Sequence, residues 1–333
     1  MTTWGWLMRV AFGTAAVGIT TAAGLLFVYQ RALIYPSSFP EGSRTDVDTP
    51  EQYDLPYREM RLTTPDGEKL HVYVMLQQDG EKDEKVSEER PTIVMFMANA
   101  GNMGHRLPLA VVFYRRLGCN VVMLSYRGYG LSSGEASEHG IRIDAQTMLD
   151  WIQAHPNLSK TKVITYGQSI GGAVSIDLAA RNPTKIAGMI LENTFLSIPE
   201  LIPTLMPFLR PFAFLCREIW PSGVTIRKLS ATMPVLFLSG GDDELVPPVQ
   251  MRTLYEICPC KHKEFHTFKN ATHNDTCFQP EYFDIIASYL LKYIVEPNGS
   301  DLTEIQKEDS EKQTEISAED PDDAWDDERK AIL

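Results

Sequence analysis

One short motif, Gly167-Gln168-Ser169-Ile170-Gly171, constrains the fold of this chain more than any other feature. It follows a β-rich run at 162–166 and precedes a stretch of helical spacing that ends before Asn182-Pro183. Glycine on both sides of one residue lets the backbone turn in a space too small for Cβ atoms. With Gly and Ser each at about 7% of positions, a chain this long should contain roughly 0.1 such matches. We therefore interpret the segment as a strand, a tight turn and a helix, with Ser169 at the turn.

Apolar segments on both sides of this unit predict a parallel sheet. Continuous apolar runs occur at 92–97, 120–125, 162–166, 186–191 and 234–238, with a last strand candidate at 264–268. Segments with helical periodicity occur at 106–117, 141–154 and 281–293. Apolar strands that alternate with helices are typical of a parallel sheet buried on both faces. Before them, 58–63 and 69–76 alternate around a Pro-Asp-Gly turn, which predicts a hairpin.

Two loops late in the chain supply the partners that a reactive serine needs. Asp242 and Asp243 follow the strand predicted at 234–238, and His273 lies beyond the last strand candidate. A serine hydroxyl is a weak nucleophile unless a base accepts its proton and an acid orients that base. In sites built on such a turn, the order along the chain is Ser, then Asp or Glu, then His. Because Ser169, Asp243 and His273 follow this order, we predict a catalytic triad; a plain turn serine is the alternative.

Two backbone amides are predicted to receive the negative charge that develops on a carbonyl oxygen. The first is the amide of Ile170, directly after Ser169. The second should come from the loop after the strand at 92–97, where small residues permit a close approach, and we assign it to Asn99. Both roles belong to the backbone, so the identity of the two side chains carries little information.

The N-terminal region predicts a membrane anchor. Val10–Tyr29 contains 20 residues without a charge and lies between Arg9 and Arg31, which is long enough for a helix to span a hydrocarbon core. A cleaved signal peptide is the alternative, but its apolar region would be shorter and would end at a small-residue site. We expect an uncleaved, single-pass anchor in an endomembrane. Basic residues flank both ends, so the orientation stays open.

The alternation of strands and helices stops between Phe195 and Trp220. This segment is rich in Phe and Leu and has prolines at 199, 203, 207 and 211, which prevent one long helix. We expect short helices that form a cap, at about 195–221, over the carboxyl edge of the sheet. An apolar cap of this kind would bind acyl chains or lie on a membrane, and simple packing over the core is the alternative.

The net charge of −13 is concentrated at the C-terminus, where Asp301–Leu333 holds 13 acidic and 4 basic residues. Such a segment is typical of disorder, and Trp325 within it offers an anchor for a protein partner. The remaining charge of −4 excludes the basic surface of a nucleic-acid-binding protein.

The sequence predicts neither a metal site nor a cofactor. Its five cysteines are scattered, they match no common zinc spacing, and no phosphate-binding loop occurs.

The chain resembles a branch of the α/β-hydrolase superfamily over roughly residues 25–295. This branch comprises membrane-anchored serine hydrolases related to the fungal bud-emergence family and to α/β-hydrolase domain-containing protein thirteen. The segments that carry the resemblance are LIYPSSFPEGSR, NAGNMGHR, YRGYGLSSG, GQSIGG, LSGGDDELVPP and THNDT. The resemblance implies an α/β-hydrolase fold with a mostly parallel central sheet flanked by helices, one N-terminal anchor and no cofactor.

The family's site residues fall on the positions already singled out. By position, the nucleophile falls on Ser169, the base on His273 and the acid on Asp243 rather than Asp242. One departure concerns Met97-Ala98, where relatives usually carry His-Gly. The Cβ atom of Ala98 therefore enters the oxyanion loop at a place where glycine usually stands.

These observations predict a serine hydrolase that cleaves acyl esters or thioesters through an acyl-enzyme. Members of the branch are viewed as esterases or acyl-protein thioesterases, so a palmitoyl-protein is the first expected substrate. A lipid carboxylesterase, a serine peptidase and a non-catalytic membrane scaffold stay open as alternatives. The expected organisation is an anchor at 1–35, a hydrolase domain at 36–296 and an acidic tail at 297–333.

Overall fold

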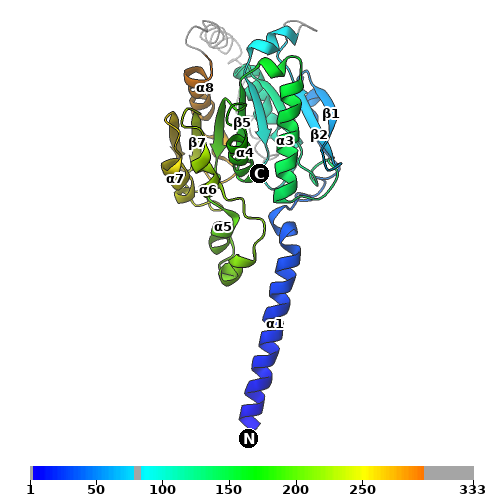
Figure 1. The fold of residues 1–333 in the computed structure, drawn as a ribbon, viewed down its shortest axis with the longest axis vertical. Helices are drawn as coiled ribbons and strands as arrows, with labels where there is room; N and C mark the ends of the chain where they lie inside the picture. The colour runs from blue at the N-terminus through cyan, green and yellow to red at the C-terminus, as the bar shows by residue number, and fades with distance from the viewer. Residues whose placement is uncertain (1–2, 79–83, 296–333) are drawn as a thin grey trace, which may run out of the picture.

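An eight-stranded sheet in the order β1-β2-β4-β3-β5-β6-β7-β8 forms the centre of the protein (Figure 1). The computed structural model of the chain describes residues 3–78 and 84–295. The strands are β1 Arg58–Thr63, β2 Lys69–Met75, β3 Thr92–Phe96, β4 Asn120–Leu124, β5 Val163–Gln168, β6 Gly188–Glu192, β7 Val235–Gly240 and β8 Lys263–Phe268. β1 pairs with β2, and β2 with β4, in antiparallel fashion, whereas all other neighbours are parallel. The mostly parallel sheet and the predicted hairpin are confirmed.

The sheet is buried on both faces where the sequence is continuously apolar. Every residue of β3, β4, β5, β6 and β7 is buried, whereas β1 and β8 at the two edges are partly exposed. Because β3, β5, β6, β7 and β8 are parallel, the loops that follow them gather at one edge of the sheet. In open α/β sheets this carboxyl edge is where ligands bind.

Helices flank the sheet and connect its strands. The longer connections are α2 Leu107–Val111 continued by the wider turn η4 Val112–Arg116, α3 Glu138–Ala154, α4 Ile170–Arg181, α7 Pro248–Ile257 and α8 Tyr282–Tyr293. The short ones are η1 Pro50–Tyr53, η2 Glu84–Glu89, η3 Gly104–Arg106, η5 Leu158–Lys160, α6 Ser222–Thr225, η7 Ile226–Lys228 and η8 Thr276–Phe278. Helical periodicity at 141–154 therefore marks most of α3, which begins earlier because Ser137 caps it by accepting a hydrogen bond from the Gly140 amide.

The proline-rich segment forms two short helical pieces at the carboxyl edge, α5 Ile198–Leu205 and η6 Pro207–Leu215. Ser197 caps α5 through a hydrogen bond from the Glu200 amide. We call residues 198–215 the cap. Phe195 and Trp220, at the two ends of the segment, are buried in the core of the domain. The cap is thus held at both ends by aromatic side chains that belong to the domain beneath it.

The N-terminal helix α1, Thr3–Ile34, projects away from the sheet, and its C-terminal end meets the domain near α5 (Figure 1). This helix covers the uncharged stretch Val10–Tyr29. Among the residues that the structure describes, no helix combines the length and hydropathy needed to cross a membrane, so the expected transmembrane helix is not confirmed. The acidic tail at 297–333, with Trp325, lies outside the described residues.

Candidate active site

Ser169 lies at a strained turn between β5 and α4. Its backbone angles, φ 54° and ψ −118°, fall in a region that residues with a Cβ atom rarely adopt. A Cβ atom on Gly167 would come within 2.2 Å of the Gly171 carbonyl oxygen, and one on Gly171 within 2.2 Å of the Phe96 carbonyl oxygen. Both motif glycines are therefore required by close backbone approach. The strand–turn–helix interpretation of the motif holds, and strain at a turn of this kind is a feature of nucleophile sites.

The loops after β7 and β8 bring Asp243 and His273 together. The Nδ1 atom of His273 lies 2.8 Å from Oδ2 of Asp243, and both side chains are buried. The other carboxylate oxygen of Asp243 accepts hydrogen bonds from the amides of Leu245, at 2.9 Å, and Val246, at 2.7 Å. Asp242, the neighbouring acid, is exposed to solvent. The structure therefore pairs His273 with Asp243, the acid that the motif comparison favoured.

The backbone of the histidine loop is fixed from three directions. The Gln168 side-chain amide, from the residue before the serine, donates to the His273 carbonyl at 3.0 Å. The Asn193 side-chain amide, directly after β6, donates to the same oxygen at 3.0 Å, and the His273 amide donates to the Glu244 carboxylate at 3.2 Å. Neither Gln168 nor Asn193 stood out in the sequence. Both act by holding the position of the imidazole rather than by reaching the cavity.

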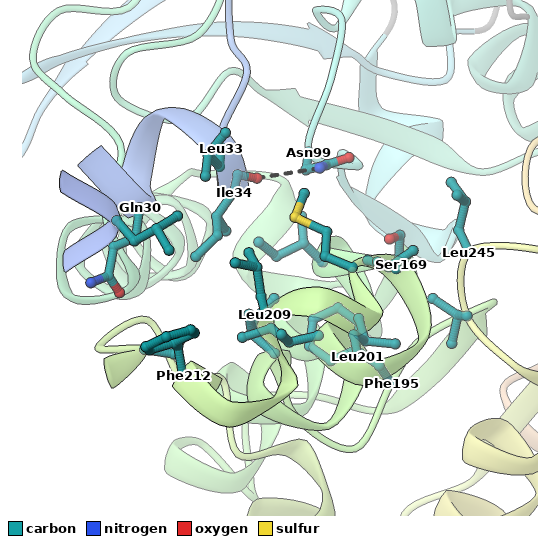
Figure 2. Close-up of a pocket in the computed structure, with 18 of the residues that line it drawn as sticks. Gln30, Leu33, Ile34, Asn99, Ser169, Phe195, Leu201, Leu209, Phe212 and Leu245 are labelled. Atoms are coloured by element: carbon teal, nitrogen blue, oxygen red, sulfur yellow. Dashed lines mark hydrogen bonds between the residues drawn. The ribbon is translucent and has the colours of Figure 1, made fainter. Parts of the chain in front are cut away.

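Ser169 and His273 line one cavity of about 300 Å3 at the carboxyl edge of the sheet. Figure 2 shows this cavity with Ser169 at one side and mostly apolar side chains around the rest. Leu201 and Leu209 reach it from the cap, and Leu245 from the loop after β7. The volume is within the range of small-molecule sites. The reactive groups thus open into an apolar space and not into a polar groove.

The predicted oxyanion residues border the same cavity. Ile170 begins α4, so its backbone N–H is one of those for which a helix has no internal acceptor. Asn99 lies in the loop after β3, where its carbonyl accepts a hydrogen bond from the Tyr129 hydroxyl at 2.7 Å. The Asn99 side chain donates to the Ile34 carbonyl at the end of α1, at 3.2 Å (Figure 2). The sequence predicted a role for the Asn99 backbone amide only, whereas the Asn99 side chain also links this loop to the end of α1.

Met97-Ala98, where relatives usually carry His-Gly, lies in the interior of the domain. Both side chains are buried, and the Met97 carbonyl accepts a hydrogen bond from the Tyr126 hydroxyl at 3.2 Å. The same carbonyl lies 2.9 Å from where a Cβ atom on Gly171 would stand, so the oxyanion loop packs directly against the serine turn.

A buried acid, Glu192, lies beneath the serine turn. Its backbone carbonyl accepts a hydrogen bond from the Ser169 amide at 2.9 Å. One oxygen of its carboxyl group accepts from the hydroxyl of Tyr166, at 2.6 Å, and from that of Tyr282. The second oxygen has no hydrogen-bond partner among the described residues. Burial is the main cause that raises the pKa of the Glu192 carboxyl above its ordinary value.

Nothing in the described residues indicates a metal centre. Within 3–78 and 84–295, no three His, Cys, Asp or Glu side chains come together in a way that could hold an ion. All five cysteines are free thiols, and four of them are buried.

Part of the cavity comes from a region that sequence reasoning assigned to the anchor. Leu26, Gln30, Leu33 and Ile34 of α1 line the space that contains Ser169. No motif marks these residues, because they belong to an uncharged helix and the chain between them and the serine is long. The only available signal was that apolar residues continue past Tyr29 to the end of the helix.

Comparisons with known proteins agree with this fold. A family model described as alpha/beta hydrolase fold matches residues 91–214. The chain is similar to the protein bem46 of Schizosaccharomyces pombe, with 50% identity over 280 residues, which cover 84% of this chain and 91% of that protein. It is also 39% identical over 288 residues to the uncharacterized membrane protein YNL320W of Saccharomyces cerevisiae, covering 86% of this chain and 98% of the relative.

Solved structures show the same fold at low identity. The Pyrococcus furiosus esterase Pf2001 superposes with a TM-score of 0.60 at 18% identity, covering 75% of this chain and 96% of the esterase. Acetyl xylan esterase 1 from Thermoanaerobacterium superposes with a TM-score of 0.56 at 17% identity, covering 72% of this chain and 83% of that one. At these identities the likeness extends to the fold alone.

Proposed function

The chain belongs to the bem46-like family of α/β-hydrolases, and from this premise we propose that it is a serine hydrolase of fatty acyl thioesters and esters. The observation that carries the proposal is the position of Ser169 and His273 on one apolar cavity, with Asp243 bonded to the far side of the imidazole. Esterases among the structural neighbours support acyl chemistry by analogy of fold.

The proposed reaction follows from the positions of these side chains. With a proton on Nδ1 shared with Asp243, His273 keeps Nε2 free to accept the proton of the Ser169 hydroxyl. The serine oxygen then attacks the acyl carbonyl, and the amides of Ile170 and Asn99 receive the developing negative charge. The imidazolium returns its proton to the departing thiolate or alkoxide, leaving an acyl-enzyme. Water, deprotonated by His273, releases the fatty acid and restores the serine.

Within this class, we favour acyl-protein thioesters, with palmitoyl-cysteine as the expected group. The support is an apolar cavity next to a helix and a cap that expose large hydrophobic side chains, since palmitoylated cysteines lie at membrane surfaces. A carboxylester of a lipid would present the same acyl chain to the same cavity, so the two substrates differ only in the leaving group. A peptidase would need a groove for an extended polar backbone, and the cavity offers little polar lining.

The first test uses a fluorophosphonate probe on the full chain and on Ser169→Ala. We expect labelling of the wild type and none of the folded variant. Absence of Ser169-dependent labelling in folded protein would reject the enzyme and favour the membrane scaffold.

A second test compares kcat/KM for two matched C16 substrates that differ in the leaving group, an S-palmitoylated peptide and a palmitoyl glycerol ester. A higher kcat/KM for the ester would replace the thioesterase proposal with a lipid carboxylesterase.

We further propose that the protein works on an endomembrane, bound to it through α1. The support is the uncharged stretch of the helix, the exposed Trp4 and Trp6 near its start, and the naming of the yeast relative as a membrane protein. The cap adds Phe208 and Phe214, which are 75% and 80% exposed. Flotation of the purified chain with phospholipid vesicles tests this proposal. Recovery of the protein only at the bottom of the gradient would contradict it.

A further inference from the structure

The last three turns of α1 form one wall of the cavity that holds Ser169. Leu26, Gln30 and Ile34 line this space and lie on one side of the helix, at intervals of four residues. Figure 2 shows the end of α1 beside the cavity, across from the cap residues Leu209 and Phe212. The hydrolase cavity is therefore closed on one side by the N-terminal helix and not by the hydrolase domain alone.

Hydrogen bonds fix this wall to the far side of the cap. Gln30 is only 8% exposed. Its side-chain oxygen accepts from the Arg217 amide at 2.6 Å, and its amide group donates to the Leu215 carbonyl at 3.3 Å. These are the hydrogen bonds of a buried polar group that joins two segments far apart in sequence. Gln30 therefore joins α1 to the C-terminal end of the cap and to the residues that follow it.

A second set of contacts anchors the helix at its last turn. The Arg31 guanidinium lies 2.8 Å from the Glu218 carboxylate, whose side chain is only 4% exposed. The Tyr35 hydroxyl donates to the same carboxylate at 2.9 Å and accepts a hydrogen bond from the Trp220 indole at 2.9 Å. The buried network leaves α1 little freedom to leave the cavity. A linker between a membrane anchor and an independent domain would not need such contacts.

The lining of the cavity identifies what this wall would bind. Leu26 and Ile34 on α1 line a space to which the cap contributes only Leu, Ile, Phe and Met side chains. Ser169 and His273 both line this space, and Figure 2 shows Ser169 at one side of it, with Gln30 of α1 and Phe212 of η6 at the opposite side. A single unbranched acyl chain, with its carbonyl at the serine, matches this arrangement of one reactive end and an apolar remainder.

We propose that α1 is part of the acyl-binding site and that Leu26 is a specificity-determining residue for long acyl chains. The inference rests on the proposed function for the identity of the carbonyl at Ser169. The acyl chain would lie between α1 and the cap. Its distal carbons would pack on Leu26, eight residues and about two helical turns from Ile34 at the catalytic end.

A matched pair of variants tests the proposal in the full chain. Leu26→Trp places a bulky side chain in the cavity, whereas Leu25→Trp makes the same change at a neighbouring residue that is 55% exposed. For Leu26→Trp we expect kcat/KM for a C16 acyl substrate to fall roughly 10-fold relative to a C4 substrate. Leu25→Trp should leave this ratio unchanged. An unchanged ratio in Leu26→Trp, with fluorophosphonate labelling retained, would overturn the proposal.

A readout independent of turnover separates this inference from the proposed function. Ser169→Ala protein is incubated with a palmitic acid that carries a diazirine, irradiated, and mapped by mass spectrometry. We expect cross-links on α1 between residues 26 and 34 as well as on the cap, and loss of the α1 cross-links in Ser169→Ala with Leu26→Trp. Cross-links on the cap without any on α1 would overturn the inference. Cross-links on α1 in a protein whose wild type hydrolyses no acyl substrate would instead reject the proposed function, and with it the role of Leu26 in specificity, but would leave α1 as part of an acyl-binding site.

Discussion

The two sides of the cavity are built in opposite ways. We call the side that carries Ser169, Asp243 and His273 the polar side, and the side made by α1 and the cap the apolar side. The polar side consists of loops that follow parallel strands of one sheet, so the sheet gathers them at one edge, and the loops after the neighbouring strands β7 and β8 bring Asp243 and His273 within hydrogen-bond distance. The apolar side joins segments that lie about 180 residues apart in sequence, such as Gln30 and Leu215, and no sheet positions them.

This difference implies that the polar side carries out the chemical step, whereas the apolar side selects among acyl chains. On the polar side, a shift of about 1 Å would disturb proton transfer, and strained backbone and buried hydrogen bonds prevent it. On the apolar side, non-directional contacts with an acyl chain tolerate small shifts. A few hydrogen bonds between α1 and the end of the cap therefore suffice to hold this side of the cavity together. Changes on the polar side should therefore affect all substrates, whereas changes on the apolar side should discriminate by chain length.

The largest expected effect concerns the acid of the polar side. Asp243→Asn keeps the shape of the side chain but removes the charge that fixes the tautomer of His273, so we expect kcat to fall by about 10^4-fold for short and long substrates alike. Asp242→Asn is the matched control, because Asp242 is exposed, and should change kcat by no more than about twofold. Steady-state hydrolysis of C4 and C16 esters measures both. Equal losses in the two variants would mean that the acid has been misassigned.

A smaller effect is expected from the serine turn. In Gly171→Ala, the new Cβ atom would meet the Phe96 carbonyl oxygen at 2.2 Å, so the oxyanion loop or α4 must shift. We expect the free energy of unfolding to fall by about 1–3 kcal/mol and activity to fall for every chain length. Gly24→Ala has open space around it and should do neither. Denaturant unfolding of both variants, with fluorophosphonate labelling rates, gives the comparison. A stable Gly171→Ala protein with full activity would show that the turn is not tightly packed.

A hydrogen bond from the Asn99 side chain joins the proposed oxyanion loop to the end of α1. Asn99→Ala removes the hydrogen bond to the Ile34 carbonyl while leaving the backbone amide that is proposed to receive the oxyanion. The loss of one such bond is worth about 0.5–1.5 kcal/mol, so we expect kcat to fall about 2- to 10-fold. Asn270→Ala, at an exposed loop position, is the control. A change confined to the C16 substrate would show that Asn99 belongs to the apolar side alone.

The same contrast explains what the sequence could reveal. The strands, the turn at Ser169 and the order of Asp243 and His273 follow local rules of spacing, so they could be predicted before the fold was known. The pairing of Gln30 with Leu215 follows no local rule, because an uncharged helix is compatible with a membrane anchor and with a cavity wall. The predicted boundary at residue 35 thus separates the anchor from the domain at a point beyond the residues that line the cavity.

The smallest predicted effect concerns the buried acid beneath the serine. Burial raises the pKa of Glu192 in the folded state above its unfolded value, so the folded protein holds the proton more tightly. Stability should therefore decline as the pH rises from the unfolded pKa through the folded pKa, where the folded protein must bury a charge. Glu192→Gln has no such charge and should remove this decline. The Tm of the variant relative to that of the wild type should therefore rise by about 2 °C between the acidic and the alkaline end of the pH range.

Thermal unfolding of wild type and Glu192→Gln between pH 4 and pH 8 measures this gain. Glu264→Gln provides the control of opposite sign. Partial burial raises the pKa of Glu264, but hydrogen bonds from Lys292 and Tyr293 together lower it further, so that its pKa lies below the ordinary value. The stability that ionised Glu264 contributes is present above the unfolded pKa and lost as the pH falls, so this variant should lose most at high pH. Parallel pH profiles for wild type and Glu192→Gln would mean that Glu192 is ionised in the fold. The polar side would then hold a buried charge directly below Ser169, and its electrostatic field, in addition to the strained turn, would act on the serine.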